Sequence, residues 1–251
     1  MPPLTLLLLF LAGFSGGFVD SVAGGGGLIT MPALLACGLT PQVALGTNKF
    51  QSSFGTTLAV WRYARAGLMG SPWLGLAIAA AFVASAGGAL AVSAMDKALL
   101  QKLIPWMLAA VAVYTALNPR FGLHAATQNM RWLPFAALFG IVLGFYDGFF
   151  GPGTGTFWTV ACVMLLGLDL RRATAYTKAA NLASNLGSLV IFLPNGSVHF
   201  VAAGAMIAGQ LIGAQAGSGF VIKHGAKFIR PVFLAVVFAL TAKLIWDAMK
   251  R

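Results

Sequence analysis

Long apolar stretches separated by short polar links run through the whole chain. In the first half they cover residues 4–23, 28–37, 44–63, 71–93 and 100–117, and in the second half 132–150, 155–167, 173–193, 199–222 and 228–247. Several approach the roughly 20 residues that a helix needs to cross about 30 Å of hydrocarbon, whereas membrane barrel strands have about ten residues of alternating character. The pattern therefore predicts an all-α integral membrane protein.

The second half of the chain repeats the first at an offset of 129 residues. Residues 24–92 align with 153–221 without a gap, and the matching positions include several glycines and one lysine, Lys49 with Lys178. Glycines at breaks and a lysine inside an apolar span are residues that a shared backbone and a shared site would require. We predict two repeats of about five helical segments each, and their bounds are 1–118 for the first, 119–131 for a linker and 132–251 for the second.

Basic residues change sides between the two halves. Arg62 and Arg65 follow the third segment of the first half, and no Lys or Arg follows the third segment of the second half. Conversely, Arg171 and Arg172 precede the third segment of the second half, and its counterpart has no such residues. Since lysine and arginine concentrate on cytoplasmic loops, this swap predicts that the second repeat enters the membrane inverted relative to the first.

Glycine-rich breaks precede the short second segment of each repeat, at Gly24–Gly27 and at Gly151–Gly155. Such sequences cannot hold a continuous helix, and non-helical backbone at membrane depth is tolerated only where it is buried or lines a cavity. We therefore expect the first two segments of each repeat to form a broken or re-entrant pair. The alternative is that these glycines only allow close helix packing. In the first interpretation the breaks offer backbone N–H groups to a substrate from Gly25, Gly26, Gly153 and Thr154.

Polar side chains gather on the third segment of each repeat, around a lysine. A lysine at mid-membrane costs roughly 2.5 to 3.5 kcal/mol, so such residues usually face a cavity or a partner. Because the chain contains no Glu and only five acidic residues, Lys49 and Lys178 favour a functional role. The alternative for the neutral side chains is hydrogen bonding between helices. The predicted substrate-binding residues of these segments are Asn48, Lys49, Gln51, Ser52, Thr177, Lys178, Asn181 and Asn185.

Other kinds of site lack support in the sequence. The three histidines and two cysteines have no metal-ligand spacing, no nucleophile has a partner at a recognisable distance, and no phosphate-binding loop is present. We expect no catalytic residue, no metal and no cofactor. The net charge of +11 is assigned to membrane topology and to attraction of anions, and not to nucleic acid. Asp20 and Asp147 precede the glycine-rich breaks, where they could carry protons or neutralise the lysines, and no role is assigned to them.

Several motifs together resemble the TauE/SafE family of sulfite exporters, and most closely its YfcA-like branch. They are Gly13-Phe14-Ser15-Gly16-Gly17-Phe18 to Gly27, Gly46-Thr47-Asn48-Lys49-Phe50-Gln51, Gly144-Phe145-Tyr146-Asp147-Gly148-Phe149-Phe150-Gly151-Pro152-Gly153-Thr154-Gly155 and Thr177-Lys178-Ala179-Ala180-Asn181. The resemblance covers nearly the whole chain. It implies a multi-pass permease of the bacterial inner membrane that moves sulfite, sulfoacetate or related organosulfonates.

The expected function is export of a small sulfur-containing oxyanion by alternating access around a midplane site. A potential that is negative inside drives an anion outward by about 2.3 kcal/mol per charge per 100 mV, so no coupling ion is strictly required. The expected partners are the anion and the lipid bilayer. Import of another small anion, a non-transporting assembly or anchoring subunit, the coupling ion, and a monomer or homo-oligomer all remain open.

Overall fold

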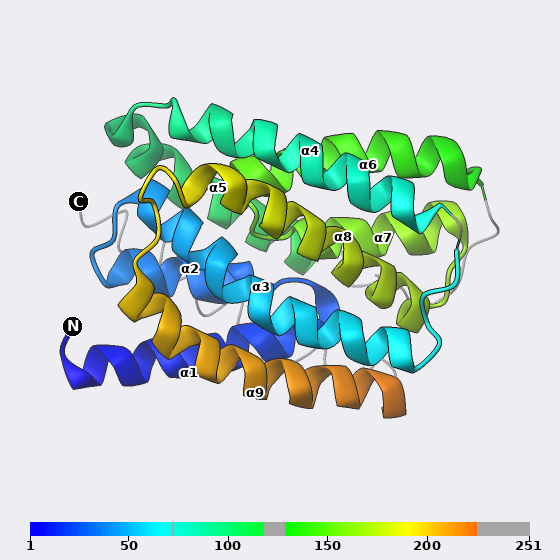
Figure 1. Cartoon of the computed structure of the whole chain (residues 1–251), viewed down its shortest axis with the longest axis horizontal. Coiled ribbons are helices and arrows are strands. Elements are labelled where there is room, and N and C mark those ends of the chain that lie inside the picture. The colour runs from blue at the N-terminus through cyan, green and yellow to red at the C-terminus, as the bar shows by residue number, and fades with distance from the viewer. Residues whose placement is uncertain (72, 118–128, 225–251) are drawn as a thin grey trace.

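The described part of the chain is entirely helical. The computed structural model describes residues 1–71, 73–117 and 129–224 (Figure 1). These ranges contain nine helices and no strand: α1 (Pro3–Ala23), α2 (Gly27–Ala36), α3 (Pro41–Arg65), α4 (Leu74–Ser93), α5 (Lys97–Leu117), α6 (Trp132–Phe149), α7 (Thr154–Leu166), α8 (Leu170–Phe192) and α9 (Phe200–His224). The predicted tenth segment, 228–247, and most of the linker lie outside the described residues. The all-α prediction is confirmed for the rest.

Four of these helices, α1, α4, α6 and α9, are long and apolar enough to cross a membrane. They also carry large apolar side chains on their outer surfaces, such as Leu4 on α1, Val83 on α4 and Ile141 on α6, which are 67%, 70% and 57% exposed. Exposed apolar side chains in such numbers mark a surface that meets something other than water. Together these features support a multi-pass membrane protein.

The two most polar helices, α3 and α8, begin earlier than the hydrophobic pattern predicted. Pro41 occupies the first turn of α3, where its missing N–H costs nothing. Asp169 precedes α8, and its side chain accepts hydrogen bonds from the backbone N–H groups of Arg171 and Arg172. Neither Pro41 nor Asp169 belongs to an apolar run, so a search for apolar runs alone places the starts of α3 and α8 too late.

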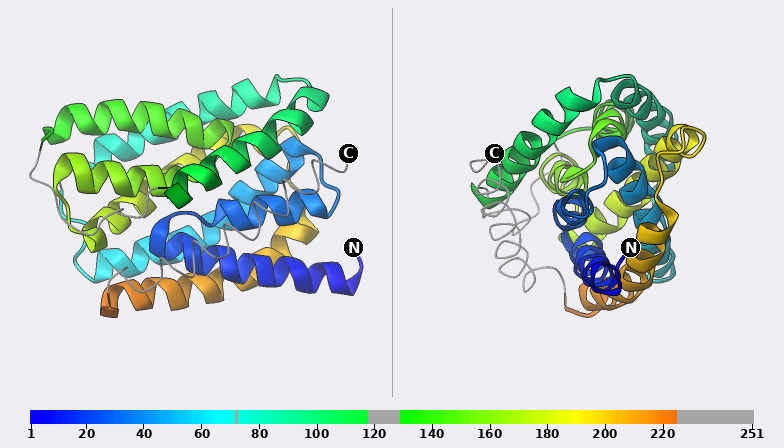
Figure 2. Two further views of the ribbon diagram at one scale, coloured as in Figure 1. Left: turned by 180° about the vertical axis from the view of Figure 1, so that it is seen from behind. Right: turned by 90° about the vertical axis from the view of Figure 1, so that its left-hand side faces the viewer.

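Two helical hairpins enter the molecule from opposite ends. In the left view of Figure 2, α1 and α2 run inward and back on the side of the N-terminus, while α6 and α7 do the same from the other side. Their turns meet in the interior, where Gly24 lies directly against the backbone of Gly155 and Gly27 against Pro152. Gly24 and Gly151 adopt positive φ angles of 76° and 92°, which a side chain would disfavour.

Glycines allow the outer helices to pack at backbone distance. Helix α1 lies along α9 and α4 lies along α6 (Figure 1). A Cβ at Gly213 of α9 would collide with the carbonyl oxygen of Phe14 in α1, and one at Gly148 of α6 would collide with that of Ser85 in α4. Small residues at helix interfaces are the usual route to close packing in membranes, since burial away from lipid gives little driving force.

This packing predicts different effects for two glycines of the same helix. We expect Gly213→Ala to lower the melting temperature of the purified protein in detergent, because the added Cβ forces α9 away from α1. In contrast, Gly204→Ala places its Cβ in open space and should leave stability unchanged or raise it, since alanine is the better helix former by about 0.8–1 kcal/mol. Equal melting temperatures for the two variants would contradict the close α1–α9 contact.

Candidate functional site

Helices α3 and α8 pack against each other and carry the two central lysines. The side chains of Lys49 and Lys178 are almost fully buried, with exposed fractions of 2% and 0%. Polar side chains on these helices also bond their own backbone, as when Ser53 Oγ donates to the carbonyl oxygen of Lys49 and Ser188 Oγ to that of Ser184. Such bonds reduce the number of unpaired hydroxyl groups on polar helices in an apolar interior.

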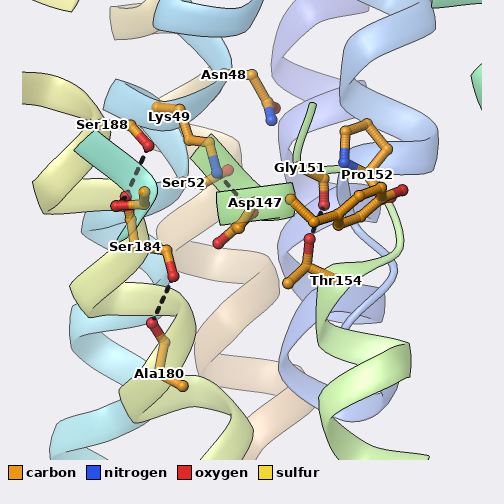
Figure 3. Close-up of polar contacts among 12 residues, drawn as sticks. Asn48, Lys49, Ser52, Asp147, Gly151, Pro152, Thr154, Ala180, Ser184 and Ser188 are labelled. Atoms are coloured by element: carbon orange, nitrogen blue, oxygen red, sulfur yellow. Dashed lines mark hydrogen bonds and ion pairs between the residues drawn. The ribbon is translucent and has the colours of Figure 1, made fainter. Parts of the chain in front are cut away.

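Each buried lysine meets a carboxylate from the other half of the chain. Lys49 Nζ donates a hydrogen bond to Asp147 Oδ1 over 2.6 Å (Figure 3). Lys178 Nζ lies 3.0 Å from Asp20 Oδ2, yet it makes no contact with hydrogen-bond geometry to any described residue. The Lys178 pair is thus a charge contact without a well-directed hydrogen bond, and its ammonium group retains free donors.

A small cavity of about 30 Å³ lies between these charges. Since one water needs at least about 10–15 Å³ by this measure, the cavity has room for about two waters. Its lining residues come from both halves of the chain: Asp20, Gly24, Gly27, Asn48, Lys49, Ser52, Asp147, Gly151, Gly155, Asn181 and Asn185. Five of the predicted binding residues, Asn48, Lys49, Ser52, Asn181 and Asn185, therefore share one chamber.

The other predicted site residues lie around this chamber and do not line it. Gln51 is buried behind Asn48, and its Nε2 donates to Asn48 Oδ1 and Ser52 Oγ at 3.0 and 2.8 Å. Thr177 is paired with Thr159 at 3.0 Å, and Lys178 lies behind Asp20.

The glycine-rich turns line the cavity, but with glycines that neighbour the predicted binding residues. Gly24 and Gly27 line it where Gly25 and Gly26 were expected, and Gly26 packs against Asp20 instead. In the second turn, Gly151 and Gly155 line the cavity. Gly153 packs on Val111, and Thr154 Oγ1 donates to the Gly151 carbonyl oxygen (Figure 3). The two turns thus supply backbone to the chamber, one residue away from most of the predicted positions.

The two aspartates are the residues for which the sequence suggested functions without deciding between them. They lie 127 residues apart, whereas the lysines lie 129 apart, so an ungapped alignment does not superpose them. Each aspartate lies seven residues before the start of the next helix, so the shift arises after that point: α7 has 13 residues against 10 in α2, and the connection that follows it is one residue shorter. A search that allowed a two-residue gap between the aspartate and the lysine would have matched Asp20 with Asp147.

The helix ends around the cavity favour an anion in the chamber more than they favour the aspartates. Helices α2 and α7 start there without a side-chain cap, and a helix N-terminus carries partial positive charge and unpaired N–H groups. Asp20 and Asp147 lie in the last turns of α1 and α6, where the helix dipole opposes a negative charge. The lysines therefore supply the main stabilisation of both carboxylates.

No group of His, Cys, Asp or Glu able to hold a metal ion occurs among the described residues. Cys37 and Cys162 are both free, and Cys162 is buried in an apolar cluster with Phe135 and Trp158. The chemistry on offer in the chamber is thus charge and hydrogen bonding: the Lys49 ammonium group, the carboxylates of Asp20 and Asp147, amides, a hydroxyl and backbone N–H groups. These groups suit reversible recognition of a small anion.

Comparison with known proteins agrees with this membrane architecture. Residues 9–244 match the family described as sulfite exporter TauE/SafE. The chain is 40% identical to the probable membrane transporter protein YfcA of Escherichia coli K12 over 98% of this chain and 91% of that protein. It is 39% identical to a probable membrane transporter protein of Haemophilus influenzae, over 96% of this chain and 95% of that protein. No solved structure matches. The chain belongs to the TauE/SafE family of membrane transporters.

Proposed function

We propose that this protein exports a small sulfur-containing oxyanion, such as sulfite or an organosulfonate, across the bacterial inner membrane. The observation that carries the proposal is one polar chamber lined by the buried ammonium group of Lys49 and by residues of two uncapped helix N-termini, with a second buried ammonium group, that of Lys178, in contact with the lining residue Asp20. Lysines at this depth are costly and occur where they serve a pathway or a partner. The substrate class and the direction rest on the family description, which is that of sulfite exporters.

In this proposal Lys49 binds the anion directly, and Lys178 adds positive charge from behind Asp20. Asn48, Asn181 and Asn185 line the chamber and can orient the oxygens of the anion, while Gln51 holds the Asn48 amide in place. Hydrogen bonds to charged groups contribute about 1.5–3 kcal/mol each, which is enough for a few of them to select an oxyanion over a halide. The chamber excludes bulky ligands in the described conformation because it has room for only about two waters.

The transporter is proposed to consist of two inverted repeats, and contacts that recur between the halves support this. Helix α1 packs on α9 as α6 packs on α4, and α3 packs on α9 as α8 packs on α4. The Thr30–Asn48 hydrogen bond has its counterpart in Thr159–Thr177, where both residue numbers rise by 129. In the same way, the bond from the Gly70 N–H to Tyr176 corresponds to that from the His199 N–H to Thr47. Contacts related in this way are typical of a two-fold axis.

Alternating access then follows from movement of one repeat against the other. The interior chamber lies where the two hairpin turns meet, so a tilt of the halves would open it first to one side and then to the other. In the described conformation both lysines are neutralised by aspartates. An entering oxyanion would have to displace an aspartate from its lysine, which couples substrate binding to rearrangement of the contacts between halves.

The inverted arrangement predicts opposite accessibility for two equivalent loop positions. Ala66 and Asn195 are both exposed in turns after the third helix of each half, 129 residues apart. With Cys37 and Cys162 replaced by serine, we expect a membrane-impermeant maleimide to label Asn195→Cys in intact cells and Ala66→Cys only after permeabilisation. Both variants should label in detergent, which controls for reactivity. Labelling of both from the same side would contradict the inverted repeats.

The site predicts loss of anion binding when either buried lysine loses its charge. We expect Lys49→Gln to weaken binding of sulfite or an organosulfonate by about 10- to 100-fold, the equivalent of one charge-assisted hydrogen bond, and Lys178→Gln to weaken it less, because Lys178 adds positive charge without direct contact. Binding is measured as the anion-dependent rise in melting temperature of the purified protein, with a panel of inorganic and organic anions. Lys102→Gln, at an exposed position of α5, is the matched control and should bind normally.

A paired variant separates loss of binding from loss of folding. Removing Lys49 alone leaves Asp147 as an unpaired buried charge, which is strongly destabilising. In Lys49→Gln/Asp147→Asn both charges disappear, so the protein should fold while still failing to bind the anion. Full affinity in this folded double variant would rule out Lys49 as an anion ligand.

A further inference from the structure

The two lysine–aspartate pairs at the centre of the molecule have a net charge of zero. Lys49, Asp20 and Asp147 line the chamber, Lys178 contacts Asp20 without lining it, and no other described acidic or basic side chain lines it. An anion added to this neutral set would leave a net negative charge in a site of low dielectric constant. Such uncompensated charge is strongly unfavourable.

We propose that each monovalent anion is carried together with one proton, and that Asp147 is the proton acceptor. This inference rests on the proposed function, since it assigns the coupling ion of the same site. When the anion engages Lys49, the ammonium group leaves Asp147, and the Asp147 carboxylate takes up a proton from the water on the side from which the anion enters. An O–H bond forms on the carboxylate, no covalent bond to the anion is made, and the loaded site is again neutral.

Asp147 is suited to this role because Lys49 is its only hydrogen-bond partner in the described part of the chain. Its Oδ1 accepts from Lys49 Nζ, while its Oδ2 is buried with no hydrogen-bond partner among the described residues. The carboxylate also lies in the last turn of α6, where the helix dipole disfavours a negative charge. Without Lys49 the ionised form therefore loses its one hydrogen-bond donor among the described residues. Asp20 is the more exposed of the two, with 15% of its side chain accessible against 6% for Asp147.

Other titratable groups near Asp147 are engaged elsewhere. On α6 itself, the Tyr146 hydroxyl donates to the Pro152 carbonyl oxygen over 2.9 Å. Helix α4, which packs along α6, has no titratable side chain, and on α8 Lys178 is held by Asp20. The remaining titratable residues of the described helices that pack on α6 are buried among apolar side chains, bonded to a loop or exposed at a helix start: Cys162, Tyr176, Arg171 and Arg172.

An anion that travels with its proton crosses the membrane without net charge. The membrane potential then does no work on the loaded carrier, unlike the potential-driven export that the sequence alone allowed. Direction is set by the gradients of the anion and of the proton. Export would occur when the anion accumulates inside the cell.

Proton uptake on binding can be measured directly by calorimetry. The probe is methanesulfonate, which stays a monoanion through the neutral range, so any proton taken up belongs to the protein. We expect the binding enthalpy to vary with the ionisation enthalpy of the buffer, corresponding to about one proton per anion. The dissociation constant should rise about tenfold per pH unit on the alkaline side.

Three Asp→Asn variants locate the proton. Asp147→Asn mimics the protonated acid, so binding should become independent of pH and take up no proton. Asp169→Asn, at the exposed N-cap of α8 where asparagine caps equally well, should behave as the unmodified protein. Proton uptake that survives in Asp147→Asn and is lost in Asp20→Asn would overturn the assignment to Asp147.

Failure of the inference is distinguishable from failure of the proposed function. Binding of methanesulfonate by the unmodified protein with the same enthalpy in every buffer would overturn proton coupling and leave the anion site intact. Absence of methanesulfonate binding would overturn both. The buffer comparison uses the unmodified protein only, so it remains decisive even if Asp147→Asn does not fold.

Discussion

Two ammonium groups buried in an apolar interior are the constraint on which the rest of the structure depends. Each is tolerable only with a carboxylate in contact, and each carboxylate comes from the other half of the chain. The two pairs therefore tie α3 to α6 and α8 to α1 across the centre of the molecule. The polar helices α3 and α8 can occupy the core because the apolar helices α1, α4, α6 and α9 surround them.

The hairpin turns are where this electrostatic arrangement meets the backbone. A helix that stopped at mid-depth with ordinary side chains would leave unpaired N–H and C=O groups in an apolar medium. Here the turns lie against each other, with Gly24 on Gly155, and face the polar chamber. At these turns α1 and α6 end next to their aspartates, and α2 and α7 begin next to the cavity. Helix C-termini, which disfavour a negative charge, therefore lie beside helix N-termini, which favour one.

Much of this was predictable from the sequence because it depends on residue types with few alternatives. Apolar length gave the helical membrane class, the glycine-rich breaks gave the hairpins, and the scarcity of acidic residues marked Lys49 and Lys178. Neutralisation of the lysines by Asp20 and Asp147 was considered from the sequence and not assigned, because the longer α7 shifts the spacing and because a linear pattern does not show distances in space. Gly24 lines the chamber and its neighbour Gly25 does not. This difference depends on the backbone dihedral angles of the hairpin turn, which the sequence pattern does not specify.

The pairing of Lys49 with Asp147 also bears on how the proposed carrier would avoid leaking ions. If the chamber binds the substrate as proposed, Asp147 acts as an internal anion in its absence, so the empty site presents no free positive charge to chloride or other abundant anions. Displacing it requires a ligand that interacts with Lys49 at least as well as the carboxylate does, which an oxyanion with several acceptor atoms can do better than a spherical ion. Selectivity and closure of the pathway would then have one cause, the competition between the substrate oxyanion and the Asp147 carboxylate for the Lys49 ammonium group. Because the competitor Asp147 is anchored on α6 and Lys49 on α3, the outcome of that competition changes a contact between the two halves, and with it the balance between their relative positions.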